Sequence, residues 1–329
     1  MATQRIFNSL QENDKTTGRF ERKPTSFRDK VTADGSSGYK AEAGRYHLYV
    51  SYACPWASRC LAFRSLKGLQ DAIPVHTVAP RWGVIDEPTG AKSWVFSDQE
   101  IGGRKTNDGL NNTKSMRELY ELHDPQYADR YTVPVLWDSQ TKKIVNNESS
   151  EIIRMFNTEF NAFAKHPEVD LYPAEQREEI DALNTWMYET INNGVYKCGF
   201  ATSQAAYEEA FQVLFATLDD AEEKLSKTRF LGGNKPNEAD IRLFVTLVRF
   251  DPVYVQHFKT NKKRIADYPN LWGYTRDVYQ WPGIAETVNL VQIKEHYFGS
   301  HPRINPLGIV PAGPEIDFAT PHGRDQLFA

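Results

Sequence analysis

The sequence predicts an α/β domain followed by an all-α domain. Between residues 43 and 165, short runs rich in aromatic and β-branched residues alternate with helical patterns. Beyond residue 170 the apolar residues recur only at helical spacing. A chain of 329 residues, 40% of them hydrophobic and 25% charged, can bury two sizeable cores. We therefore expect domains at 43–165 and 170–329, preceded by a polar arm, residues 1–42, laid over the surface.

The first domain is expected to contain four strands and three helices. Aromatic and branched residues predict strands at 46–51, 73–78, 133–138 and 143–145, the last two as a hairpin. Apolar residues at helical spacing predict helices at 57–66, 114–122 and 148–156. The remainder of the segment 80–130 has less regular patterning.

The second domain is expected to be helical throughout. Apolar positions over 180–191 predict a helix that ends at Asn193 and Gly194. Similar spacing predicts further helices at 211–225, 241–248 and 284–298. The segment 241–248 is apolar nearly all round, so this helix should be buried at the centre. The proline-rich tail after residue 299 should be irregular.

Charge and composition argue against several functions. The net charge of −4 provides no basic field for nucleic acid or an anionic membrane, and no apolar run is long enough to span a membrane. The N-terminus carries acidic residues and lacks the apolar centre of a secretory signal, so we expect a cytoplasmic protein. Three cysteines, Cys54, Cys60 and Cys198, form neither a disulfide framework nor a zinc pattern, so we expect no metal.

Cys54 is the strongest candidate for a catalytic residue. It precedes Pro55, Trp56 and Ala57, where the first strand passes into the first helix. Helix-start N–H groups and the helix dipole stabilise a thiolate there, which predicts a lowered thiol pKa. Ala57 stands where a dithiol site has its second cysteine, so an external thiol must resolve a mixed disulfide. A structural buried thiol is the alternative for Cys54 and our interpretation of Cys60.

Two further motifs could bind a peptide-like ligand. Pro134 after Val133 marks either a strand edge or a cis peptide that leaves the Val133 backbone free to pair with an extended peptide. Glu148 and Ser149 begin a helix, where a hydroxyl and orphan N–H groups can bind a carboxylate and Glu148 can accept from an ammonium. Taken singly, the first motif is more often a strand edge and the second a helix cap.

In this order the three motifs resemble the glutathione-transferase family, in which a thioredoxin-like domain precedes an all-α domain. A fourth match, residues 230–240, places Asn237 and Asp240 to form a reciprocal capping box before the buried helix. A cysteine at the active position resembles the omega-like subset. The chain is more similar still to the glutathionyl-hydroquinone reductases, the xi class. This similarity is carried by residues 54–57, the long insertion before 132–138, and residues 145–156, 192–196, 296–301 and 305–306.

The resemblance implies that glutathione is a co-substrate, held by Trp94, Val133, Pro134, Glu148 and Ser149. A homodimer is expected from the resemblance alone.

The resemblance also implies a reaction and an aromatic pocket lined by Tyr196 and Tyr297. The Cys54 thiolate would attack the glutathione sulfur of a glutathionyl-hydroquinone, and the ring would leave after protonation by a phenol. A second glutathione would then free the cysteine, a reaction suited to quinone detoxification. One departure is Phe298, where some members carry another tyrosine; it leaves the shape of the pocket open.

Two other functions fit the same motifs. An omega-type thiol transferase or dehydroascorbate reductase would share Cys54 without needing the long insertion or the Tyr297 segment. A non-catalytic binding module of the same fold is the third hypothesis. It is disfavoured because a scaffold has no use for a thiol at an electropositive helix start.

Overall fold

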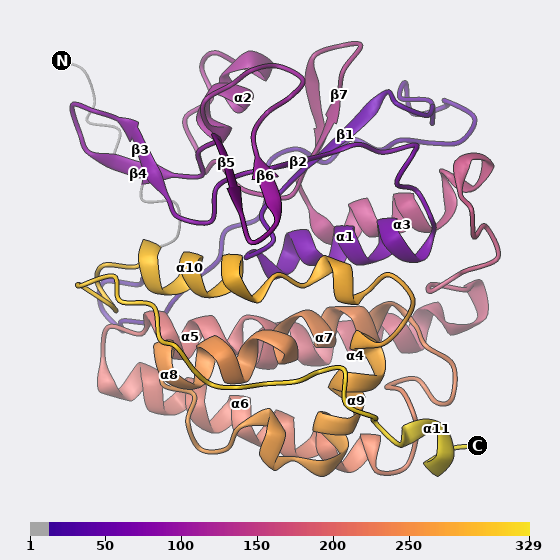
Figure 1. Ribbon diagram of the computed structural model, residues 1–329, viewed down its shortest axis with the longest axis vertical. Helices are drawn as coiled ribbons and strands as arrows, with labels where there is room; N and C mark the ends of the chain where they lie inside the picture. The colour runs from indigo at the N-terminus through magenta and orange to yellow at the C-terminus, as the bar shows by residue number, and fades with distance from the viewer. Residues whose placement is uncertain (1–12) are drawn as a thin grey trace.

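The computed structural model describes residues 13–329 and contains a sheet-bearing part and a helical part (Figure 1). The first twelve residues of the predicted arm lie outside the described residues. The strands are β1 (Tyr46–Val50), β2 (Val75–Thr77), β3 (Gly83–Asp86), β4 (Ala91–Ser93), β5 (Ser97–Ile101), β6 (Arg104–Thr106), β7 (Val135–Asp138) and β8 (Lys143–Asn146). The longer helices are α1 (Pro55–Leu66), α2 (Met116–His123), α3 (Ser149–Thr158), α4 (Arg177–Met187), α5 (Gly194–Phe200), α6 (Gln204–Leu225), α7 (Glu238–Arg249), α9 (Pro269–Tyr279) and α10 (Leu290–Ser300).

Four strands form the main sheet in the order β2-β1-β7-β8, with β1 and β2 parallel and the other pairs antiparallel. Side chains alternate between the two faces of a strand. Leu48 and Val50 therefore pack toward α1 and α3, whereas Tyr49 packs on the opposite face under Met116 and Leu119 of α2. The predicted thioredoxin-like order of strands and helices is confirmed.

The helical part packs against α1 and α3 and shares one hydrophobic core with them. Helix α7 lies at its centre, with all twelve residues buried, as its apolar pattern predicts. The capping box is also present: the Asn237 side chain accepts from the Ala239 N–H at 2.9 Å, and Asp240 accepts from the Asn237 N–H at 2.8 Å. None of the helices in residues 13–329 has the length and apolarity needed to cross a bilayer.

Of two predicted helix boundaries, one holds and one is wrong. The helical run that begins with α4 continues through a π-helical turn, η3 (Tyr188–Asn192), and ends at Asn193 as predicted, although a new helix, α5, begins at once at Gly194. The predicted helix 284–298 is broken, since α10 begins only after Asn289, whose side chain accepts from the Gln292 N–H at 3.0 Å.

The insertion between β2 and α2 is more regular than predicted. It forms two antiparallel hairpins, β3-β4 and β5-β6. The second hairpin docks on the helical part: Gln292 donates to the Ile101 carbonyl at 2.8 Å, and Arg104 donates to the Glu286 carbonyl at 3.0 Å. The hairpin therefore helps to fix α10, which carries Tyr297, against the sheet-bearing part.

Candidate active site

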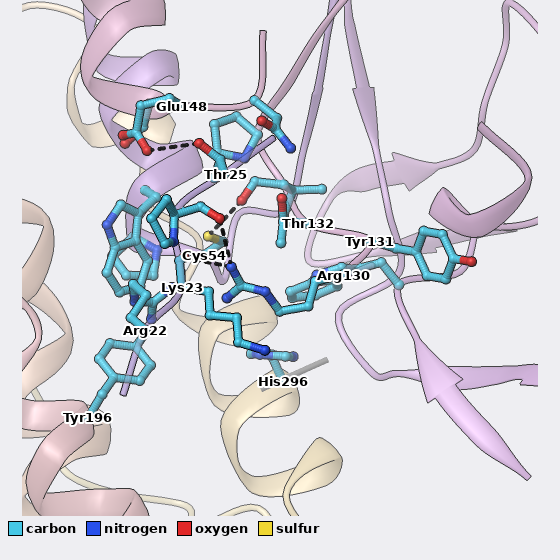
Figure 2. Close-up of a pocket in the computed structure, with 18 of the residues that line it drawn as sticks. Arg22, Lys23, Thr25, Cys54, Arg130, Tyr131, Thr132, Glu148, Tyr196 and His296 are labelled. Carbon is cyan, nitrogen blue, oxygen red and sulfur yellow. Dashed lines mark hydrogen bonds between the residues drawn. The ribbon is translucent and has the colours of Figure 1, made fainter. Parts of the chain in front are cut away.

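A pocket of about 310 Å³ opens between the two parts of the molecule, and Cys54 lies in its wall (Figure 2). All eight residues named from the sequence line this one pocket: Cys54, Trp94, Val133, Pro134, Glu148, Ser149, Tyr196 and Tyr297. They come from α1, the insertion, the β7 edge, the start of α3, α5 and α10. Motifs from both halves of the sequence thus converge on one cavity.

Cys54 is half-buried at the N-cap of α1, with Pro55 in the first turn as predicted. Its thiol lies 3.5 Å from the Val133 carbonyl oxygen, to which it donates. The Val133–Pro134 peptide bond is cis. The cysteine and the cis-proline loop therefore face each other across the pocket.

The sequence prediction that the pKa of the Cys54 thiol is lowered is wrong. Burial raises the pKa of the thiol above its ordinary value, and this effect outweighs the opposing ones. The N–H groups of Ala57 and Trp56 lower the pKa, as helix-start geometry requires, and so do the positive charges of Arg249 and Arg22. The predicted stabilising groups are present, but the desolvation of the thiol dominates.

Arg249, at the end of α7, holds the Cys54 loop from behind. Its buried guanidinium donates to the carbonyls of Tyr52 and Ala53 at 2.8 and 3.0 Å, and to the Ser58 hydroxyl at 2.6 Å. These atoms flank Cys54 on both sides along the chain. The helical part of the protein thereby helps to set the position of Cys54 and supplies a fixed positive charge near its thiol.

We predict that Arg249→Met moves the pH profile of Cys54 alkylation to higher pH, because a positive charge that lowers the thiol pKa is lost. Arg249→Lys, which keeps the charge, should shift the profile less. The rate of reaction with iodoacetamide, followed across pH on variants with native circular dichroism, measures the shift. Identical profiles for the wild type and Arg249→Met would mean that Arg249 only braces the loop.

The start of α3 caps the helix and also faces the pocket. Glu148 is the N-cap, and its carboxylate accepts from the Ser150 N–H at 3.1 Å. Its other oxygen accepts from the Thr25 hydroxyl at 3.2 Å. The Ser149 hydroxyl accepts from Arg59 at 3.4 Å and lies in the pocket wall. The pair thus caps a helix and also presents polar groups to the cavity.

Three phenols form a hydrogen-bonded chain, and two of them, Tyr196 and Tyr297, line the pocket. The Tyr196 and Tyr297 hydroxyls are 2.5 Å apart, and the Tyr254 hydroxyl lies 3.1 Å from that of Tyr297. Burial raises the pKa of all three, so they remain protonated and can donate a proton or a hydrogen bond. Tyr254 was not identified from the sequence. The one irregularity that the sequence shows near Tyr254 is Pro252, which lacks the N–H that an α-helix would pair with the Val248 carbonyl. The chain forms a π-helical turn there, η4 (Phe250–Tyr254).

The N-terminal arm is also part of the site, a role that its prediction as a layer over the surface did not include. Arg130 donates to the Lys23 and Pro24 carbonyls at 2.6 and 3.2 Å, and the Phe27 N–H donates to Asn147 at 3.1 Å. Arm residues consequently line the pocket: Arg22, Lys23, Pro24, Thr25 and Arg28. Polar residues without periodicity carried no signal for these long-range contacts.

Trp94 lies in the wall because its indole stacks on His296, with ring centroids 4.5 Å apart. His296 donates from Nδ1 to the Pro80 carbonyl at 2.8 Å, and burial lowers its pKa to about 3, so the ring is neutral. Phe298 packs on His257, with ring centroids 4.9 Å apart, and is not among the pocket-lining residues. The Tyr-to-Phe departure at this position therefore does not alter the pocket wall.

The other two cysteines are buried and lie outside the pocket wall. Burial raises the pKa of Cys60 well above its ordinary value and that of Cys198 to about 12. The prediction of Cys60 as a packing residue agrees with this environment. Within residues 13–329, no cluster of three or more histidine, cysteine or acidic side chains is arranged to hold a metal ion.

Comparison with known proteins identifies the class that this fold and site define. The glutathione S-transferase N-terminal domain matches residues 53–159, and the glutathione S-transferase C-terminal domain matches residues 204–277. The chain belongs to the glutathione S-transferase family and, within it, to the Xi class.

The class assignment rests on relatives that match almost the whole chain. Glutathionyl-hydroquinone reductase YqjG of Escherichia coli is 51% identical, covering 95% of this chain and 94% of that protein. Glutathionyl-hydroquinone reductase PcpF of Sphingobium chlorophenolicum is 48% identical, covering 90% of each chain. The glutathione-bound structure of YqjG superposes with a TM-score of 0.87 at 52% identity, covering 92% of this chain and 97% of that one. The Xi transferase of Phanerochaete chrysosporium gives 0.86 at 49% identity, covering 94% and 96%.

Proposed function

We propose that this protein reduces glutathionyl-hydroquinones to hydroquinones, using glutathione as the reductant. The observation that carries the proposal is the placement of Cys54 in one pocket with the Tyr196–Tyr297 phenol pair. A thiol supplies the nucleophile, and protonated phenols supply a proton donor that can also stack on an aromatic ring. Relatives named as glutathionyl-hydroquinone reductases support the same reaction.

In this proposal glutathione lies along the wall formed by Trp94, Val133, Pro134, Glu148 and Ser149. The Glu148 carboxylate accepts from the glutathione ammonium, and the Ser149 hydroxyl with the α3 N-terminus binds a carboxylate. The Val133 backbone, next to the Cys54 thiol, pairs with the extended peptide. This arrangement brings the glutathione sulfur to Cys54.

The first half-reaction transfers glutathione to the protein. The substrate reacts as the tautomer in which the ring carbon bearing sulfur is protonated and the neighbouring oxygen is a carbonyl. The Cys54 thiolate attacks the glutathionyl sulfur, an S–S bond forms, and the sulfur–carbon bond breaks. Its electron pair enters the ring and ends on the oxygen as a phenolate, which takes a proton from the Tyr196–Tyr297 pair.

The second half-reaction regenerates the thiol. A second glutathione, as its thiolate, attacks the glutathionyl sulfur bound to Cys54 and leaves as glutathione disulfide. Because Ala57 stands in place of a second cysteine and Cys60 and Cys198 are buried, no thiol of the protein competes for this step.

Turnover of 2-glutathionyl-hydroquinone with glutathione, followed by chromatography of the hydroquinone formed, tests the proposal. The expected result is rapid reduction with slow conjugation of a chlorodinitrobenzene. The second candidate is the omega-type thiol transferase or dehydroascorbate reductase, favoured by the names of fungal relatives such as "Glutathione S-transferase omega-like 2" of Schizosaccharomyces pombe, 49% identical. Rapid reduction of dehydroascorbate with no action on the hydroquinone adduct would decide for that candidate.

A homodimer and a cytoplasmic location belong to the proposal as well. The motivation is the family resemblance for the first and the sequence composition for the second. Light scattering during size-exclusion chromatography tests the homodimer, and a monomer would refute it. Fractionation of the cells that produce the protein tests the cytoplasmic location, and a secreted protein would refute it.

A further inference from the structure

Arg22, a residue of the N-terminal arm, is placed in the pocket with an unused hydrogen-bond donor. Its Nε donates to the Asn193 side chain at 3.2 Å. Its Nη2 is buried and has no hydrogen-bond partner among residues 13–329. A buried N–H group without a partner costs stability, and a guanidinium donor costs more than a neutral one. The position of Arg22 in the pocket wall gives that donor a ligand to meet.

Aromatic rings surround the guanidinium and hold its charge in the pocket. Arg22 lies 3.8 Å from the Trp56 ring centroid, 5.3 Å from that of Tyr196 and 5.7 Å from that of Phe20. Such cation–π contacts stabilise a cation without accepting conventional hydrogen bonds from it. The guanidinium charge therefore stays available to a ligand, and an aromatic ligand can stack on the same rings of Trp56, Tyr196 and Phe20.

The positive charge of Arg22 acts on both reacting groups of the proposed mechanism, the Cys54 thiol and the Tyr196 phenol. Figure 2 draws Arg22 between Cys54 and Tyr196. Its positive charge lowers the pKa of the Cys54 thiol and of the Tyr196 phenol, although burial raises both overall. Arg22 thus lies on the side of the pocket where, in the proposed mechanism, the bond between the glutathionyl sulfur and the ring carbon breaks. The groups proposed to hold the polar ends of glutathione, Glu148 and Ser149, belong to a different element, α3.

We propose that Arg22 is the anion-binding residue of the hydroquinone subsite. Its Nη2 donates a hydrogen bond to the ring oxygen that becomes a phenolate as the sulfur–carbon bond breaks. The electron pair of that bond ends on this oxygen, next to the Arg22 cation among the rings of Trp56, Tyr196 and Phe20, where a preorganised donor stabilises the developing charge. The inference rests on the proposed function. It specifies that the substrates carry an ionisable hydroxyl on the ring carbon next to the one that bears sulfur.

Kinetics on two substrates test the role of Arg22. For Arg22→Gln we expect kcat/KM on 2-glutathionyl-hydroquinone to fall about 10- to 100-fold, the effect of one hydrogen bond to a charged group. The mixed disulfide of glutathione and 2-mercaptoethanol, which releases no phenolate, should react within about threefold of the wild type. Arg22→Lys should recover part of the activity. Equal losses on both substrates, no loss on either, or a loss confined to the KM of glutathione would each overturn the assignment.

Arg19→Gln is the matched control, because Arg19 lies on the same arm but pairs with Glu209 at 2.6 Å, outside this pocket. It should leave both activities unchanged. Loss of hydroquinone activity in Arg19→Gln equal to that in Arg22→Gln would show that both act by anchoring the arm, and would overturn the proposal.

A binding measurement separates this inference from the proposed function. Wild-type protein without hydroquinone-reductase activity would refute the function, yet the subsite can still be measured with 4-nitrophenol bound to Cys54→Ser. Arg22 should lower the pKa of the bound phenol relative to free 4-nitrophenol, and adding Arg22→Gln should remove the shift. Other titratable groups that line the cavity remain in both variants: Lys23, Arg28, Arg130, Tyr131, Glu148, Tyr188, Tyr196, His296, Tyr297 and His301. Equal titration with and without Arg22 would overturn the subsite.

Discussion

Replacing Cys54 by serine should abolish the reduction of glutathionyl-hydroquinones. A serine hydroxyl stays protonated near neutral pH and cannot form a mixed disulfide with glutathione, so the first half-reaction has no nucleophile. Removing a nucleophile that acts as part of a catalytic unit costs on the order of 10⁴-fold or more in kcat. Steady-state turnover of 2-glutathionyl-hydroquinone by Cys54→Ser measures the loss.

The same variant should gain a conventional conjugating activity. The introduced serine would stand at a helix start and can donate a hydrogen bond to the thiolate of bound glutathione, which then becomes the nucleophile toward a chlorodinitrobenzene. Cys198→Ala is the control, because Cys198 is buried outside the pocket. After treatment with glutathione disulfide, the wild type and Cys198→Ala should each gain one glutathione by mass and Cys54→Ser none. An adduct retained in Cys54→Ser would place the reactive thiol elsewhere.

The parts of the site that the sequence predicts are those fixed by local chemistry. Cys54 before Pro55 at a strand-to-helix junction, proline at 134 and Glu148 with Ser149 each specify a backbone feature within a few residues. The predicted fold class and family are confirmed by the glutathione S-transferase domains that match residues 53–159 and 204–277. The roles of these residues in binding and catalysis stay predictions, as do the domain limits at 43–165 and 170–329.

The parts that the sequence does not predict depend on distant contacts. Arg22 reaches the pocket because the arm is held by partners far along the chain, such as Arg130 and Asn147. Nothing in the local pattern of the arm encodes those contacts. The raised pKa of Cys54 is a similar case, since the burial that causes it comes from the whole pocket and not from the helix start.

Tyr297→Phe is expected to separate the two kinds of substrate. The Tyr297 hydroxyl joins those of Tyr196 and Tyr254, at 2.5 and 3.1 Å, so its removal breaks the phenol chain at the middle. Release of a hydroquinone requires a proton for the departing ring, and a positioned acid contributes about 10²- to 10⁴-fold. We expect kcat on 2-glutathionyl-hydroquinone to fall by that factor.

The mixed disulfide of glutathione and 2-mercaptoethanol should react at nearly the wild-type rate in Tyr297→Phe, because a departing aliphatic thiolate does not need a proton delivered to a ring carbon or its oxygen. Tyr46→Phe is the matched control: Tyr46 is equally buried, but its hydroxyl donates to the Lys40 carbonyl at 2.7 Å, away from the pocket. Equal losses of Tyr297→Phe on both substrates would mean that Tyr297 only packs against its neighbours. The preferred function would then move to an omega-type thiol transferase, which needs Cys54 but no phenol beside the leaving group.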